Sequence, residues 1–294
     1  MTLRAALPSI SRFTLGTASL GQPGADADRD LAVIRTALDG EAWIHTSREY
    51  TDGGAFTVLR RAIDDAGSKP ARLIVKIQCD DADAVQADVE QALRELNIDR
   101  IDIAQLCRDT HDHRRIVDDL LNHGPMYETC ARLQSRNLVG NYIFEVFPGF
   151  ADDARTAVTH DLFDACTFYF NPLQRFAPLA LWRSMQERNT PIFALRTLGG
   201  TRHEPAEAAR HAEAAGKHQH AERLRQLQGP YRASGSASWP QFCIRYALST
   251  PNVQTTIAGT ASPEHCAALV AAAADFQPLD EAIMQQIDAL HAMG

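Results

Sequence analysis

The feature that most constrains this chain is a regular alternation between short runs rich in β-branched or aromatic residues and longer amphipathic segments. The short runs predict eight strands, at residues 12–19, 42–47, 72–78, 101–107, 139–144, 165–170, 192–198 and 254–259. The segments between them place apolar residues at helical spacing, as at Leu31, Ile34 and Leu38. Because an intervening helix makes the flanking strands parallel, we predict an α/β fold, a (β/α)8 TIM barrel with eight parallel strands, as one domain over residues 1–294.

A long polar segment interrupts the alternation after the seventh strand. Residues 201–238 are rich in alanine and carry four histidines. We interpret them as a helical insertion within the barrel domain, which could form a lid over the barrel mouth. Pairs such as His211 with His218, or His203 with His220, lack a cysteine or carboxylate at a recognisable ligand spacing, so we expect no metal site.

Composition and charge bound the class of protein. The 294 residues are 45% hydrophobic and can bury a large core, and the net charge of −8 argues against a nucleic-acid or anionic-membrane surface. There is no apolar run of about 18 residues, so we expect no membrane-spanning helix, and the first residues make a poor secretion signal. Six cysteines without paired spacing fit reduced thiols. We expect a cytoplasmic protein whose partner is a small-molecule substrate.

In a barrel of this kind, function lies at the carboxyl ends of the strands. Lys76 stands inside the apolar run "LIVKIQ", where burial would disfavour its charged form and make the amine chemically useful. Nearby strand ends carry further polar residues. Four of them predict a substrate site for an anionic or carboxylate-bearing ligand: Arg48, Arg108, Asn141 and Arg196.

Several segments, in their order and spacing, resemble the aldo-keto reductase superfamily over nearly the whole chain. "FTLGTASLG" resembles the glycine motif of that family's first strand, and "WIHTSREYTDGG" resembles its "FIDTAxxYGxG" element. "LIVKIQ" matches the strand that bears the catalytic lysine, and "ALRELNIDRIDIAQLCRD" resembles "SLxxLxxdYIDLyxxH". "FALRTLGG" and "IAGTASPEHCAAL" stand where the family has "AYSPLxxG" and "IPGxxxxxqlxeN".

The resemblance implies an enzyme that reduces aldehydes or ketones with NADPH through an Asp, Tyr, Lys and His tetrad. Tyr50 matches the tyrosine that gives the proton, and Lys76 matches the lysine beside it. His45 stands at the aspartate position and Cys107 at the histidine position, so two of the four are changed. Cys107 is either a small filler or a nucleophile activated by Arg108 or His45.

The family's cofactor contacts are altered as well. The Ser-Asn pair that holds the carboxamide aligns with Tyr142 and Ile143, and the 2′-phosphate position aligns with Ala261. The remaining cofactor positions implied by the resemblance are Thr167, Leu195, Gly259, Thr260 and Ser262, with Leu195 replacing the aromatic residue that stacks on the nicotinamide. Because these changes remove stacking, amide recognition and charge, we predict weak or no NADPH binding and no required cofactor, with NADPH as the alternative.

Three functions remain open on these residues. With His45 at the aspartate position, Lys76 is predicted to lack an anionic partner, unless Glu49 or Asp109 supplies one, and a neutral lysine could act as a base or Schiff-base nucleophile. This favours a non-redox enzyme on a small polar carbonyl-type substrate, such as a lyase, dehydratase or isomerase, using Tyr50, Lys76 and His45. The alternatives are an NAD(P)H-dependent oxidoreductase with an atypical cofactor site and a non-catalytic binding protein.

Overall fold

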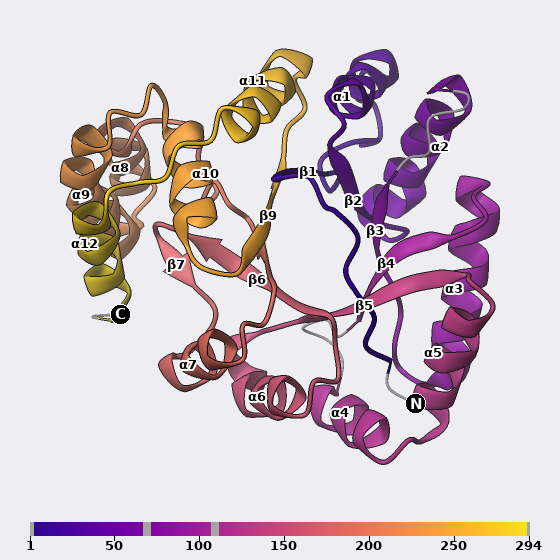
Figure 1. The fold of residues 1–294 in the computed structure, drawn as a ribbon. Coiled ribbons are helices and arrows are strands. Elements are labelled where there is room, and N and C mark those ends of the chain that lie inside the picture. Colours follow the sequence, from indigo (N-terminus) through magenta and orange to yellow (C-terminus); the bar gives the residue numbers. More distant parts are fainter. Residues whose placement is uncertain (1–2, 67–71, 107–111, 293–294) are drawn as a thin grey trace.

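The predicted barrel is confirmed by a computed structural model, which describes residues 3–66, 72–106 and 112–292. Eight parallel strands close into a ring in the order β5-β4-β3-β2-β1-β9-β8-β6, and β5 pairs with β6 to complete it (Figure 1). The ring strands are β1 (Phe13–Gly16), β2 (Trp43–Ser47), β3 (Leu73–Lys76), β4 (Ile101–Leu106), β5 (Val139–Glu145), β6 (Ala165–Asn171), β8 (Ile192–Leu195) and β9 (Val253–Gly259). A two-residue strand that was not predicted, β7 (Gln174–Arg175), pairs antiparallel with β6 outside the ring.

Helices surround this ring on the outside (Figure 1). They are α1 (Ala27–Asp39), α2 (Gly54–Ala66), α3 (Ala82–Leu96), α4 (His113–Leu121), α5 (Pro125–Ser135), α6 (Ala151–Thr159), α7 (Leu179–Glu187), α10 (Trp239–Ser249) and α11 (Pro263–Ala274), with the short turns η1 (Tyr50–Gly53) and η2 (Pro148–Phe150). Side-chain caps start several of them: Asp81 accepts a hydrogen bond at α3, and Ser262 does so at α11. None of the helices within the described residues is long and apolar enough to cross a membrane.

The predicted helical insertion consists of two helices between β8 and α10. These are α8 (Pro205–Ala214) and α9 (His218–Ala233), which pack against each other through small and aliphatic side chains such as Ala209, Ala221 and Leu224. The last helix, α12 (Glu281–Ala292), packs on α9, so the three helices form one group beside the barrel (Figure 1). That this group serves as a lid stays a prediction.

The barrel interior follows the alternation of side chains along each strand. Its apolar filling is a cluster separate from the larger core between strands and helices: Trp43, Ile74, Ile103, Ile143, Ala165, Phe193, Leu195 and Ile257. The next interior position lies two residues later along a strand, toward its carboxyl end. On β2 to β5 these positions hold His45, Lys76, Gln105 and Glu145. A polar layer therefore covers the apolar filling at the barrel mouth.

Candidate functional site

A cavity of about 610 Å³ opens over this polar layer at the carboxyl ends of the strands. Its walls include His45, Tyr50 and Lys76 together with Leu195 and Arg196. The structure thus brings the predicted catalytic residues His45, Tyr50 and Lys76 into one cavity, although they come from β2, η1 and β3. This is the end of a TIM barrel at which active sites lie.

Lys76 has an anionic partner in this layer, Glu145 at the end of β5. The Lys76 Nζ lies 2.9 Å from one carboxylate oxygen of Glu145 and 3.2 Å from the other. Both side chains are withdrawn from solvent, with 14% of the lysine and 2% of the glutamate side chain exposed. The prediction that Lys76 lacks a counter-charge is therefore wrong, because Glu145 supplies one; Asp109, the other candidate besides Glu49, lies outside the described residues. A carboxylate at hydrogen-bonding distance favours the ammonium form of the lysine.

Gln105 connects this ion pair to His45, and the donors in the network all point toward Glu145. The Gln105 Nε2 donates to Glu145 at 2.6 Å, because an ionised carboxylate can only accept. The amide oxygen of Gln105 then faces His45 Nε2 at 2.8 Å. His45 must donate through Nε2, which leaves its Nδ1 as the unprotonated nitrogen. The four residues form one hydrogen-bonded chain across β2, β3, β4 and β5.

His45 is the neutral member of this network. Burial, reinforced by the positive charge of Lys76, lowers the pKa of His45 from 6.5 to about 3, although the hydrogen bond with Gln105 opposes the shift. The ring is therefore uncharged at neutral pH. An uncharged imidazole at the position of the family's aspartate cannot balance Lys76, and Glu145 performs that task from the opposite side of Gln105.

Tyr50 stands beside the network, on the turn that follows β2. Its ring centroid lies 6.0 Å from Lys76 Nζ and 6.4 Å from the centroid of His45. The turn η1 is held by Thr51, whose hydroxyl accepts from the amide of Ala55 and lies 2.9 Å from the carbonyl of Leu20. Lys76 and Tyr50 are therefore close enough for the ammonium to influence the phenol electrostatically.

A second cavity of about 470 Å³ adjoins the first, and both are lined by Arg196, Ala258 and Gly259. Arg196 follows β8 with a φ of 50°, and its guanidinium lies 5.0 Å from the ring centroid of Tyr169. Arg202 and His203 line the outer cavity as well. An elongated ligand can lie across the two cavities, with the cation of Arg196 at their junction.

The predicted cofactor positions fall into two groups. Leu195 and Gly259 lie on the inner cavity, as the resemblance implies. Thr167 is buried and donates to the carbonyl of Phe193, while Thr260 accepts from the amide of Ser262. The hydroxyl of Ser262 caps α11 and also bonds Glu264. The hydroxyl groups of all three polar residues among the five positions thus form hydrogen bonds within the protein.

Two predicted substrate residues are placed away from the cavity. Arg48 donates to Asp88 of α3 at 3.0 Å, which ties the turn after β2 to that helix. Asn141 is buried at the amino end of the barrel, where it donates to Asp164 and to the carbonyls of Ala5 and Ala6. The reason is that β5 continues to Glu145, so Asn141 is four residues short of the mouth. Cys107 and Arg108 lie outside the described residues.

Glu145 and Gln105 belong to the site although neither was predicted from the sequence as a site residue. Both could have been found from strand parity, since Ile103 and Gln105, like Ile143 and Glu145, are separated by two positions and share a face. The predicted end of the fifth strand at residue 144 excluded the glutamate. For the same reason, the two residues that align with the family's carboxamide-binding Ser-Asn pair lie inside β5. Ile143 fills the barrel, and the Tyr142 hydroxyl donates to the carbonyl of Cys130.

Comparison with known proteins agrees with the barrel fold. The model of the aldo/keto reductase family matches residues 12–292. An aldo-keto reductase from Klebsiella pneumoniae in complex with NADPH superposes with a TM-score of 0.67 at 20% identity, covering 98% of this chain and 92% of that one. An aldo/keto reductase from the same organism, in complex with NADP and acetate, gives a TM-score of 0.66 at 20% identity and the same coverage.

Sequence search among curated proteins finds no significant match. At 20% identity the two superpositions show the fold alone. The family match, in contrast, spans nearly the whole chain, including all eight ring strands from β1 to β9. On that match the chain belongs to the aldo/keto reductase family.

Proposed function

We propose that the protein is a nicotinamide-dinucleotide-dependent reductase of a small aldehyde or ketone, in which Tyr50 is the proton donor. The observation that carries this proposal is the Lys76–Glu145 ion pair beside Tyr50 in the inner cavity. The argument for a lyase, dehydratase or isomerase depended on a neutral lysine, and the ion pair removes it. The non-catalytic alternative does not account for a buried ion pair that borders an open cavity.

The residues of the chain divide the chemistry as follows. Glu145 keeps Lys76 positively charged, and the ammonium favours the ionised form of the neighbouring Tyr50 phenol. Tyr50 can then release its proton to a carbonyl oxygen held in the cavity. His45 and Gln105 fix the orientation of the carboxylate through their hydrogen bonds. A bound dinucleotide would supply the hydride.

The two cavities suit the nicotinamide and diphosphate of a dinucleotide, but the residues at the matched 2′-phosphate position do not suit NADPH. The two adjoining cavities and the cation of Arg202 suit a nicotinamide and a diphosphate. Gly200, with a φ of 81°, lines the outer cavity as well. At the matched 2′-phosphate position, however, Ala261 carries no charge, and the nearby carboxylate of Glu264 would repel a phosphate. We therefore propose NADH as the better cofactor.

A substrate that bears its own carboxylate suits the cations of the inner cavity. Lys76 pairs with Glu145, and Arg196 has no carboxylate partner among the described residues, so its charge is available to a ligand on this wall. Matched aldehydes test this preference: succinic semialdehyde should be reduced with a higher kcat/KM than butanal. Equal values would assign Arg196 to the cofactor diphosphate instead.

The deciding experiment measures NADH and NADPH oxidation by the purified protein over a panel of aldehydes and ketones. Lys76→Met should lower kcat by at least about a hundredfold in protein that circular dichroism shows to be folded, although the variant should also be less stable, because Glu145 loses the cation that balances its buried carboxylate. Turnover of a carbonyl substrate in the absence of any dinucleotide would instead support the non-redox alternative. Equal activity of the wild type and Lys76→Met would reject every mechanism that uses this lysine.

A further inference from the structure

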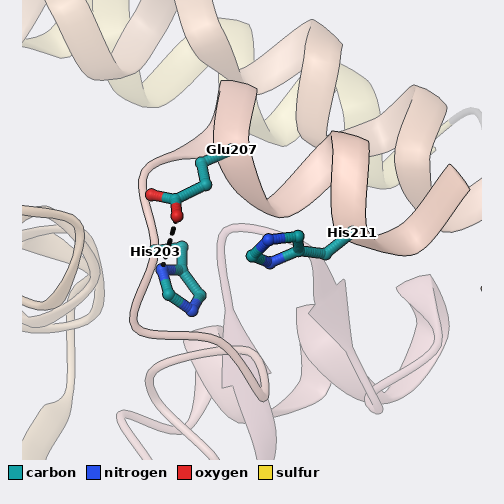
Figure 2. Close-up of side chains that lie close together, drawn as sticks. All are labelled: His203, Glu207 and His211. Atoms are coloured by element: carbon teal, nitrogen blue, oxygen red, sulfur yellow. Dashed lines mark ion pairs between the residues drawn. The ribbon is translucent and has the colours of Figure 1, made fainter. Parts of the chain in front are cut away.

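The group of helices beside the barrel carries a cluster of nitrogen and oxygen donors outside the site described above. His203 lies on the loop before α8, while Glu207 and His211 lie on α8 itself (Figure 2). One ligand atom from each residue lies within 4.8 Å of the others. We infer that His203, Glu207 and His211 form a binding site for a Zn²⁺-type divalent cation at the rim of the outer cavity.

The spacing of the residues accounts for this convergence. Glu207 and His211 are four positions apart on a helix and therefore share one face. His203 is four positions before Glu207, and the backbone amide of His203 donates to the Thr201 hydroxyl, which fixes the loop. Pro205 starts the helix at its first turn. Figure 2 shows the His203 ring and the Glu207 carboxylate facing each other, with the His211 ring beside them.

The distances suit a first-row metal ion. His203 Nδ1 lies 3.3 Å from a carboxylate oxygen of Glu207. Two ligands bound at about 2.1 Å to a tetrahedral Zn²⁺ lie about 3.4 Å apart, so this pair already has the required separation. The rings of His203 and His211 are 5.0 Å apart between centroids and nearly perpendicular. A rotation of the exposed His211 side chain would bring its ring nitrogen to the position of the third metal ligand.

Ligand chemistry selects the class of cation. Two imidazole nitrogens and one carboxylate oxygen suit Zn²⁺, Ni²⁺ or Cu²⁺, whereas Mg²⁺ and Ca²⁺ prefer oxygen ligands alone. Three protein ligands leave a coordination position open for water or an anion. His203 also lines the outer cavity together with Arg196 and Arg202, so the metal site lies at the edge of that cavity.

The supporting structure holds the site on a rigid element. The opposite face of α8 is buried against α9 through Ala208, Ala209 and Ala212. The first turn is tied to α9 by the Tyr231 hydroxyl, which donates to Glu204. No metal site was predicted from the histidine pairs of this segment, because the carboxylate ligand, Glu207, lies between His203 and His211, which were not paired with each other.

Zn²⁺ titration of the full-length, untagged, chelator-treated protein by calorimetry tests this inference. We expect one saturable site per chain, and His203→Ala, His211→Ala and Glu207→Gln should each weaken it by at least about tenfold. His218→Ala is the matched control, because His218 also pairs with a carboxylate, Glu213, at 2.7 Å. It should leave the affinity unchanged. Mg²⁺ should give no binding signal at the same concentrations.

Cobalt substitution separates a formed site from loose surface binding. Bound Co²⁺ should give the intense visible absorption of a four- or five-coordinate ion, and His211→Ala should lose it while keeping the circular dichroism of the wild type. Absence of saturable Zn²⁺ binding in the wild type would overturn the inference. So would an equal loss of affinity in His218→Ala. Both readouts need no dinucleotide, so they stand independently of the proposed reductase activity.

Discussion

At the scale of single residues, the chemistry of the cavity depends on which side chain balances Lys76. The family resemblance places that role at position 45, where this chain has a histidine that stays neutral at physiological pH. Glu145 reaches the same ammonium from β5. A carboxylate thus still pairs with the lysine, although a residue at a different position provides it.

Removing the Glu145 charge should impair both activity and stability. In Glu145→Gln the lysine keeps a hydrogen-bond partner but loses its anion, so it gives up its proton at lower pH than in the wild type. We expect kcat to fall about 10- to 100-fold, with the alkaline loss of activity displaced to lower pH. The free energy of unfolding should drop by about 1–3 kcal/mol, because Lys76 loses its ion pair with the buried carboxylate of Glu145.

Asp164→Asn provides the matched control for that variant. Asp164 is equally buried but lies at the amino end of the barrel, where it accepts from Asn141 and from the amides of Ala5 and Tyr142. Its replacement should lower stability by a similar amount and leave kcat unchanged. If the two variants lost activity in parallel, Glu145 would be a structural residue with no specific effect on Lys76.

His45 should make stability depend on pH. The folded protein keeps the ring neutral down to about pH 3, whereas the unfolded chain takes up the proton near 6.5. Stability is therefore fully present above about pH 6.5 and is lost as the pH falls toward 3, by up to several kcal/mol. Denaturant unfolding at pH 7 and at about pH 4.5 should show a smaller difference for His45→Gln than for the wild type. The exposed His218→Gln should keep the wild-type difference, and a slope retained in His45→Gln would refute the assignment.

At the scale of elements, the barrel allows a carboxylate to reach Lys76 from two strands. β2 lies directly beside β3, while β5 is separated from β3 by β4, and Gln105 fills the gap between the two carboxylate positions. Parallel strands with matched registers place these interior side chains in one layer. Lys76 therefore needs a carboxylate in this layer, but the strand that supplies the carboxylate can differ.

Moving the carboxylate from β5 to β2 tests this interchange. His45→Asp alone should lower activity, because it places a second carboxylate near one ammonium and removes the donor that Gln105 accepts from. Combined with Glu145→Gln, the same substitution should recover part of the activity that Glu145→Gln loses. Measuring kcat for the two single variants and the double variant gives the coupling directly. Losses that simply add would show that His45 and Glu145 do not act on the same lysine.

The ring strands were predictable from the sequence because β-branched runs and helical spacing repeat along the chain. The polar layer was not, because a strand end placed one residue early hid Glu145 and made Asn141 look like a mouth residue. Local pattern fixes which residues form a strand better than it fixes where the strand stops. Arg48 shows a second reason: its partner Asp88 is 40 positions away, and no local signal joins the two.

At the scale of the whole molecule, the barrel mouth and the helices beside it form a continuous surface for an elongated ligand. The inner cavity lies over the polar layer, and the outer cavity extends along the loop that leads into α8. Arg196, with a left-handed backbone immediately after β8, stands where the two meet.

The segment between β9 and α11 should discriminate against the 2′-phosphate of NADPH. Ala261 offers no charge at the matched position, and the carboxylate of Glu264 is held in the first turn of α11 by the Ser262 hydroxyl. We expect fluorescence titration to show NADH binding at least as tightly as NADPH. Ala261→Arg should strengthen NADPH binding about tenfold, or ~1.4 kcal/mol, and leave NADH unchanged, because the added guanidinium can pair with a phosphate that only NADPH carries. Sub-micromolar NADPH binding by the wild type, with weaker NADH binding, would contradict the proposed selectivity while leaving the roles of Tyr50, Lys76 and Glu145 in place.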